Sequence, residues 1–330
     1  MINRESLVNV AEMAAGAEAK NVPAVLLSAE EKLQRNSGSY LTLKILDGFG
    51  KVELKMFNSS MATLDSRCVR VGDVVDVDVR IQEYMNSKSP VADDIRPSLT
   101  GAVPRDFAVS APINAEETYG KIISYLDSIT NSNQGGKYTP ISDLAKGLIE
   151  ANKDAFLYSG AAKAMHHDTI SGLLYHSYRM LQSASRLCAV YTSLDSVLLC
   201  SAVAIHDIGK IREMNTTELG DITYTVQGHL MGHLYMGSEM IHDYAEANPG
   251  KYDPEKVMLL QHMILSHHLN PEWGAVKGPA TAEAQMLHYI DQIDAKMYMY
   301  EHHFDDLKPG EITDKVPFGL ENNVYKPMKH

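Results

Sequence analysis

The sequence predicts a multidomain protein in which a small N-terminal β-barrel is followed by an all-α region. Short runs of alternating apolar and polar residues lie between positions 22 and 81, as expected for strands. From Glu116 onward the apolar residues recur with a helical period instead. The 14 histidines all lie beyond residue 160, so the two parts also differ in their chemistry.

The expected strands cover residues 22–27, 40–46, 51–57 and 74–81, with a fifth near 98–102. A short helix is expected at 61–68, between the third and fourth strands. Five short strands with one helix after the third is the order of an OB-fold, a small barrel that commonly binds oligonucleotides. We therefore expect an OB-fold in this part of the chain.

Aromatic and basic side chains accompany the second and third of these strands. Tyr40 and Phe57 are candidate platforms for stacked bases, and Lys44 and Lys55 are candidate phosphate contacts. The alternative is that the aromatic rings belong to the barrel core and the lysines to a solvated face. Strand patterning alone leaves both interpretations open.

Prolines mark the expected linker between the two parts, since Pro90, Pro97, Pro104 and Pro112 interrupt a stretch with little periodicity. We expect the barrel with its lead-in and linker at 1–110, the helical domain at 111–310 and a C-terminal tail at 311–330. Asp168, Asp195 and Pro254 are suited to helix N-termini.

Composition indicates a soluble cytoplasmic protein. The chain has 330 residues, 45% of them hydrophobic and 22% charged, and its formal net charge of -12 disfavours wide non-specific adhesion to nucleic acid or anionic membranes. Its three cysteines lack metal-site or disulfide spacing. No signal peptide or stretch of about 20 apolar residues is apparent. The sequence does not specify whether a homo-oligomer forms.

The pair His206-Asp207 follows the apolar run 197–205, which reads as a buried helix. Gly209 lies where a helix would stop. An imidazole beside a carboxylate at a buried helix end is suited to one metal ion. A core histidine next to a capping aspartate is the alternative, so the interpretation depends on what the rest of the chain supplies.

Further histidines and one aspartate lie on expected helices beside apolar neighbours. Burying several histidines without partners would be costly, and a metal centre would satisfy them together. A two-metal cluster needs imidazole and carboxylate ligands with one bridging carboxylate, for which Asp207 is the candidate. His229 and His233 are four residues apart, so either could contribute.

The order of these residues resembles the metal-binding series of HD-domain phosphohydrolases in their two-metal form. All seven positions of that series have counterparts: His176, His206, Asp207, His233, His267, His268 and Asp291. The resemblance implies that these seven bind two divalent ions. It also assigns Lys210, in the run His-Asp-Ile-Gly-Lys, to the scissile phosphate, although a solvated lysine after a helix is the alternative.

Longer phrases resemble the YhaM-type 3′-to-5′ exoribonucleases of low-GC Gram-positive bacteria. They include Gly172-Leu-Leu-x-His176, Ser266-His-His268, Glu272-Trp-Gly274 and Leu287-His-Tyr-Ile-Asp291. The resemblance covers both parts of the chain in order. It implies a metal-dependent enzyme that trims single-stranded RNA, or also DNA, from the 3′ end to nucleoside monophosphates. Manganese is the expected ion, with iron, cobalt, nickel or zinc as alternatives.

Several further positions lie near the expected site, and each has alternative roles. His167 could line the substrate pocket or have a structural role, and Trp273 could stack on a base or fill a loop core. Asp294, one turn after Asp291, is expected to orient a ligand histidine or to pair with Lys296. Leu269 and Ala275 stand where the family resemblance predicts Gly and Ser.

Two other functions compete with the exonuclease. The helical domain could hydrolyse a nucleotide or cyclic dinucleotide, with the barrel serving assembly or regulation. The chain could also be a non-catalytic protein that binds single-stranded nucleic acid. The intact set of seven candidate ligands favours an enzyme.

Overall fold

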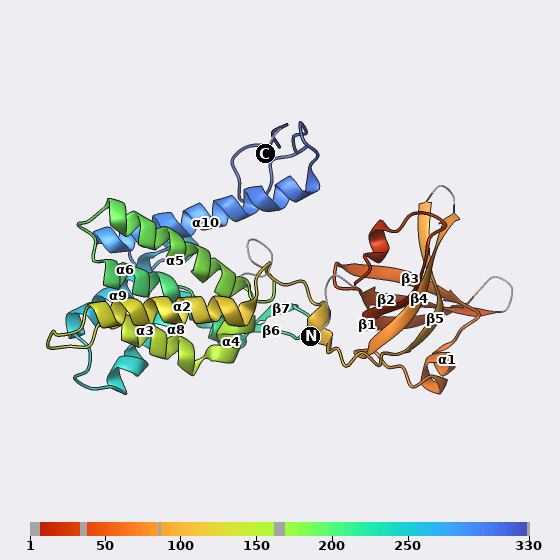
Figure 1. The fold of residues 1–330 in the computed structure, drawn as a ribbon, viewed down its shortest axis with the longest axis horizontal. Coiled ribbons are helices and arrows are strands. Elements are labelled where there is room, and N and C mark those ends of the chain that lie inside the picture. Colours follow the sequence, from red (N-terminus) through yellow and green to blue (C-terminus); the bar gives the residue numbers. More distant parts are fainter. Residues whose placement is uncertain (1–6, 34–37, 85–86, 162–168, 329–330) are drawn as a thin grey trace. The chain divides into compact units, whose positions relative to one another are not determined.

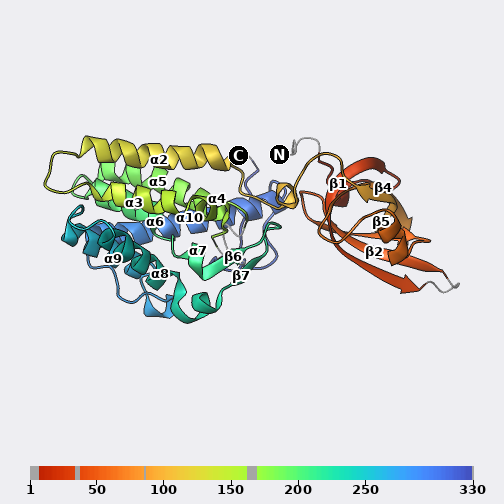
Figure 2. The ribbon, with the colours of Figure 1, turned by 90° about the horizontal axis from the view of Figure 1, so that it is seen from below.

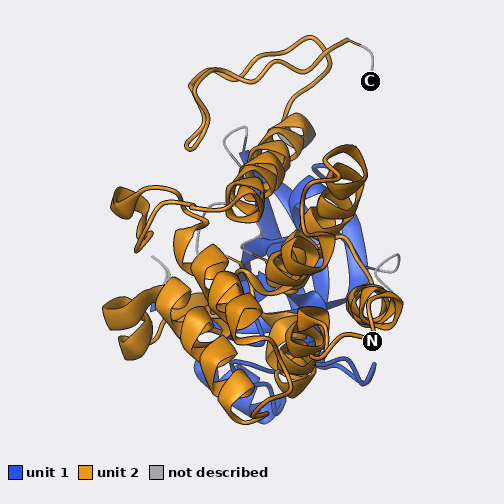
Figure 3. Ribbon diagram, turned by 90° about the vertical axis from the view of Figure 1, so that its left-hand side faces the viewer, with its two compact units in different colours: residues 1–109, 217–221 blue, residues 110–216, 222–330 orange. Residues whose placement is uncertain are grey.

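A computed structural model describes residues 7–33, 38–84, 87–161 and 169–328. The chain forms two compact units, coloured separately in Figure 3. The first comprises residues 1–109 and 217–221, and the second comprises residues 110–216 and 222–330. Within the described ranges, each helix is too short or too polar to cross a membrane.

The first unit is a closed five-stranded barrel with the strand order β1-β2-β3-β5-β4. Its strands are β1 (Glu18–Leu33), β2 (Ser39–Leu46), β3 (Lys51–Phe57), β4 (Val74–Tyr84) and β5 (Ser87–Pro97). A short helix, α1 (Met61–Ser66), follows β3. Closure pairs β1 with β4 and sets β3 parallel to β5. Alternation places Val52, Leu54 and Met56 of β3 in the barrel core.

The fifth strand was predicted at the wrong place. It covers Ser87–Pro97 rather than 98–102. The prolines Pro90 and Pro97 made this stretch read as a linker, but Pro97 is the last residue of the strand and Pro90 lies opposite Ile81 of β4. A strand end is a position where a sheet tolerates proline.

The second unit is a helical bundle built around α6 (Figures 1 and 2). Its helices are α2 (Ala115–Ser132), α3 (Ile141–Ala151), α4 (Lys153–Tyr158), α5 (Gly172–Val190), α6 (Ser196–Ile205), α7 (Lys210–Glu213), α8 (Val226–Glu246), α9 (Pro254–Ser266) and α10 (Ala282–Asp306). Residues 198–205 of α6 are all buried. This central helix therefore carries the His206-Asp207 pair into the interior.

The helical unit also contains a two-stranded hairpin, β6 (Met214–Thr216) and β7 (Ile222–Tyr224), which was not predicted. Three-residue strands are too short to show a periodicity. Two expected helix starts are confirmed: Asp195 accepts a hydrogen bond from the Leu198 amide at 2.9 Å, and Pro254 is the first residue of α9. Asp168 lies outside the described residues.

Candidate metal centre

Seven side chains from five helices and their ends converge in the interior of the helical unit. They are His176 on α5, His206 and Asp207 after α6, His233 on α8, His267 and His268 after α9, and Asp291 on α10. Among the described residues, they form three overlapping groups whose nitrogen and oxygen atoms lie within 4.8 Å of one another in each group. Residues separated by 115 positions in sequence thus meet in one cluster.

Asp207 lies between the two ends of this cluster. Its Oδ2 atom is 3.2 Å from His206 Nε2 and 4.0 Å from His176 Nε2. Its Oδ1 atom is 3.4 Å from His233 Nε2 and 3.8 Å from His267 Nε2. The two oxygens of one carboxylate therefore face two different sets of imidazoles, an arrangement suited to bridging two cations.

The histidine rings are held by hydrogen bonds on their outer nitrogen. The Nδ1 atoms of His206, His267 and His268 contact the carbonyl oxygens of Val203, Ile264 and Trp273 at 3.0, 2.8 and 2.7 Å. A carbonyl oxygen only accepts hydrogen bonds, so each Nδ1 is the protonated donor, and the Nε2 atom of a neutral ring keeps its lone pair. The Nε2 atoms are thereby available as metal ligands.

Three buried atoms of the cluster lack a hydrogen-bond partner within the described part of the chain: Asp207 Oδ1, His233 Nε2 and His267 Nε2. Unsatisfied polar atoms are rare in protein interiors because burial removes their hydrogen bonds to water. All three are donors of lone pairs, and a divalent cation would satisfy them together. The residues present therefore fit a metal centre.

The protonation states of Asp207 and His267 also suit metal binding. Burial alone would raise the pKa of Asp207, but the charge of Lys210 and the contact with His206 hold it well below its usual range. Burial, together with His268 and His206, keeps the pKa of His267 well below its usual range. Asp207 is thus an ionised carboxylate and His267 a neutral imidazole, the forms in which they bind metals.

Gly209 does not stop a helix, contrary to the prediction. The helix α6 ends at Ile205, and Gly209 has a right-handed conformation that leads directly into α7. Its role is close packing, because a Cβ atom there would lie 2.0 Å from the carbonyl oxygen of His233 on α8. This approach places Lys210 Nζ at 2.7 Å from Asp207 Oδ2.

Glu213 is a site residue that the sequence did not reveal. Its Oε1 atom accepts hydrogen bonds from the backbone amide of His233 at 3.0 Å and from His233 Nδ1 at 3.1 Å. The amide is available because Gly232 breaks the α8 ladder with a φ of 72°. Glycine adopts such a conformation readily. A Gly-His pair inside an otherwise helical run was the available signal.

We predict that Glu213→Ala lowers metal affinity by roughly 10- to 100-fold, because a carboxylate that holds a ligand histidine fixes its tautomer and orientation. Glu213→Gln should lose less, since its amide oxygen still accepts from Nδ1. Metal content after dialysis against a graded series of manganese concentrations measures the effect. Glu246→Gln, at the exposed end of α8, is the control. Unchanged metal content in Glu213→Ala would contradict the prediction.

Asp294 and Arg179 extend the network behind His176. Asp294 Oδ2 is 2.7 Å from His176 Nδ1, and Asp294 Oδ1 accepts from Arg179 Nε at 2.6 Å. Arg179 also binds Glu301. Hydrogen bonds to Asp291 and Asp294 outweigh burial and raise the pKa of His176 to about 9. Lys296 does not pair with Asp294; its hydrogen bond is to the Gly319 carbonyl.

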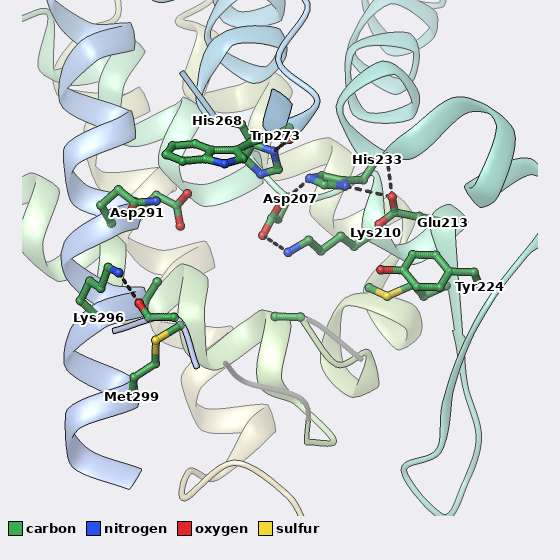
Figure 4. Close-up of a pocket in the computed structure, with 15 residues that line it drawn as sticks. Asp207, Lys210, Glu213, Tyr224, His233, His268, Trp273, Asp291, Lys296 and Met299 are labelled. Carbon is green, nitrogen blue, oxygen red and sulfur yellow. Dashed lines mark hydrogen bonds and ion pairs between the residues drawn. The ribbon is translucent and has the colours of Figure 1, made fainter. Parts of the chain in front are cut away.

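A pocket of about 530 Å³ opens onto the cluster (Figure 4). Asp207, Lys210, His233, His268 and Asp291 line it. Dashed lines in the figure join Asp207 to Lys210 and to His233. The pocket thus exposes part of the candidate metal centre and the lysine to a substrate.

The other residues considered for this site are placed differently. Trp273 lines the pocket and is 58% exposed, so it does not fill a loop core. His229 is exposed and lies beside the Tyr224 ring, while His233 joins the cluster. His167 lies outside the described residues.

The two departures from the expected pattern lie in the loop after α9. Leu269 has a φ of 67°, in the left-handed region that glycine favours. The backbone therefore keeps the conformation suited to glycine although the residue differs. Ala275 is buried, and its amide donates to the Asn270 carbonyl at 3.2 Å.

The candidate nucleic-acid residues belong to the barrel unit. The rings of Tyr40 and Phe57 are directly opposite each other on β2 and β3, with centroids 5.9 Å apart. Phe57 is 43% exposed, so its ring is not part of the barrel core. Lys44 and Lys55 are exposed on the same strands.

The helical fold and the His-Asp cluster define an HD domain, and residues 173–296 match the HD-domain family. HD domains are metal-dependent phosphohydrolases that bind divalent ions. The chain is also 34% identical over 313 residues to the 3′-5′ exoribonuclease YhaM of Bacillus subtilis, an overlap of 93% of this chain and 94% of that protein. It is 32% identical to YhaM of Halalkalibacterium halodurans, over 93% and 92% of the two chains. The chain belongs to the YhaM family of 3′-5′ exoribonucleases.

Proposed function

We propose that this protein removes nucleoside 5′-monophosphates from the 3′ end of single-stranded RNA by hydrolysis that depends on two divalent ions, with manganese as the activating ion. DNA is the alternative substrate. The position of Asp207, with one oxygen toward each set of imidazoles, carries the proposal for two ions. The full-length similarity to exoribonucleases supports the choice of substrate and direction.

The seven clustered residues would hold the two ions. When bound, the ions would supply Lewis acidity and positive charge for attack on the phosphodiester. Asp207 would bridge them, and the five histidines and Asp291 would complete their coordination. Lys210, half-buried beside Asp207, would place its ammonium group at the phosphate as negative charge builds in the transition state. Trp273 would offer an exposed ring for stacking on a base at the pocket.

We propose further that the barrel is an OB-fold that holds the RNA strand. Its strand order and the helix after β3 agree with that fold. The outer face of β2 and β3 carries the Tyr40-Phe57 ring pair with Lys44 and Lys55, which combines stacking surfaces and positive charge. In this view residues 1–110 bind RNA, residues 111–310 cleave it and residues 311–330 form a tail.

We expect the double substitution Tyr40→Ala/Phe57→Ala to weaken RNA binding by roughly 10- to 100-fold, since stacking contributes about 1–3 kcal/mol per base. Fluorescence anisotropy with a labelled single-stranded oligoribonucleotide measures the Kd, and Leu33→Ala is the control because Leu33 is an exposed apolar residue of the same barrel. A folded double variant with native affinity would assign RNA binding to another surface.

The proposed activity is tested by analysing products from an RNA with a long 3′ tail, labelled at its 5′ end. In manganese we expect stepwise shortening of the labelled strand with release of nucleoside 5′-monophosphates. EDTA should abolish both, because the unpartnered ligand atoms cannot promote hydrolysis without a cation. Hydrolysis of a free nucleotide or cyclic dinucleotide, with intact RNA, would instead indicate a small-molecule phosphohydrolase.

A further inference from the structure

The segment after α10 folds back on itself as a narrow loop, here called the C-terminal hairpin (residues 310–326). The Thr313 amide donates to the Val324 carbonyl at 2.9 Å, and the Gly310 amide donates to the Lys326 carbonyl at 2.8 Å. Ile312 and Tyr325 form an antiparallel bridge. Val324 is fully buried. The hairpin is therefore a packed part of the helical unit.

Two lysines attach this hairpin to α10. Lys326 Nζ donates to the Leu307 carbonyl at 2.7 Å and also to the Phe304 carbonyl, which satisfies acceptors at the helix end. Lys296 Nζ, from within α10, donates to the carbonyl of Gly319 at the hairpin tip (Figure 4). The tip is thereby held at the pocket.

Gly319 is one of the residues that line the pocket, together with Asp291, Lys296 and Met299 of α10. The neighbouring residue Phe318 is 82% exposed and Val316 is 50% exposed. These exposed apolar side chains could contact a base of the substrate. Aromatic rings such as that of Phe318 stack on bases with little sequence preference.

We propose that the tip of the C-terminal hairpin (residues 316–320) walls off the pocket and so restricts hydrolysis to the end of an RNA chain. This inference rests on the proposed exonuclease activity. A nuclease that cuts within a chain needs room for the strand on both sides of the scissile phosphate. The pocket volume of about 530 Å³ is in the range that encloses one small-molecule ligand. A terminal nucleotide fits such a space, and a through-running strand needs an open groove.

The test uses a single-stranded RNA in linear form and in covalently circular form, both in manganese. Three variants of the full protein are compared with the parent: a truncation after Pro309, Lys296→Met, and the control Lys315→Met. Lys296→Met removes the hydrogen bond to Gly319 together with one positive charge at the pocket. Lys315→Met removes the same charge from an exposed position of the hairpin.

The parent and the control should shorten the linear RNA and leave the circle intact. The truncated protein should cut the circle, because it lacks both the tip that walls off the pocket and the charged hydrogen bond that holds this tip. Its cleavage of the circle should be at least roughly tenfold above that of the parent. Lys296→Met should show the same change to a smaller extent. In this variant the tip of the C-terminal hairpin should also become more sensitive to limited proteolysis than in the parent. This measurement does not depend on catalysis.

The outcomes separate the two levels of the proposal. If the parent fails to shorten linear RNA, the exonuclease function fails. If the parent trims linear RNA while both altered proteins leave the circle intact, the hairpin does not restrict cleavage to ends. Loss of all hydrolysis in a folded truncated protein would also overturn the inference. If the truncation does not fold by circular dichroism, Lys296→Met with its proteolysis pattern decides.

Discussion

Replacing Asp207 by Asn should lower kcat by on the order of 10³-fold or more while RNA binding stays close to that of the parent protein. Asp207 is the one side chain of the cluster whose two oxygens face separate sets of imidazoles. An amide lacks the charge and the second lone-pair oxygen needed to join two cations. The RNA-binding candidates of the barrel, Tyr40, Phe57, Lys44 and Lys55, lie on the other unit and are unchanged.

Single-turnover cleavage of labelled RNA and anisotropy with the same RNA measure the two quantities. Asp154→Asn, at an exposed position of α4, is the matched control. Since Asp207 also accepts from the half-buried Lys210, the thermal midpoint of each variant should be recorded so that unfolding is not mistaken for lost chemistry. Cleavage at the parent rate would remove the two-ion mechanism.

Replacing Lys210 by Met should lower kcat by roughly 10²- to 10³-fold, the loss typical when one donor to a developing negative charge is removed. The ammonium group lines the pocket at 2.7 Å from Asp207. Burial opposes its charge, but Asp207 raises the pKa of Lys210, so it stays protonated at neutral pH. If the contact forms only in the transition state, kcat and kcat/KM should fall equally.

Two further variants make this result specific. Lys210→Arg keeps the positive charge and should recover part of the lost rate, although a guanidinium differs in shape. Lys121→Met removes an exposed lysine of α2 and should leave kcat unchanged. A rise in KM with kcat unchanged for Lys210→Met would show that the lysine only binds RNA.

The sequence predicted the candidate ligands of the site better than the residues that hold those ligands in place. The seven candidate ligands lie on helices or beside apolar runs, so a pattern of residue types was sufficient to select them, and the structure brings them together. Their role as ligands stays a prediction. Glu213 was missed because its contact with His233 depends on a backbone break at Gly232, which no periodicity shows.

The errors in the fold have a common physical origin. Strand prediction depends on an alternation of apolar and polar residues. The prolines interrupt this alternation in β5, and the three-residue strands β6 and β7 are too short to show it. Gly209 was interpreted as a helix stop from local rules. Glycine is needed there because the His233 carbonyl oxygen leaves no room for a side chain. Long-range contacts of this kind cannot be seen in the neighbouring residues.

The anchoring of His206 and His267 to carbonyls three residues earlier has a consequence for evolution and engineering. Each ring takes its direction from the end of its own helix, α6 or α9. One inserted residue in either helix would turn that end by about 100° and misdirect the ring. Substitutions that conserve apolar volume should therefore be tolerated there, whereas insertions and deletions should not. Length variation should instead gather in exposed connections such as residues 133–137, between α2 and α3.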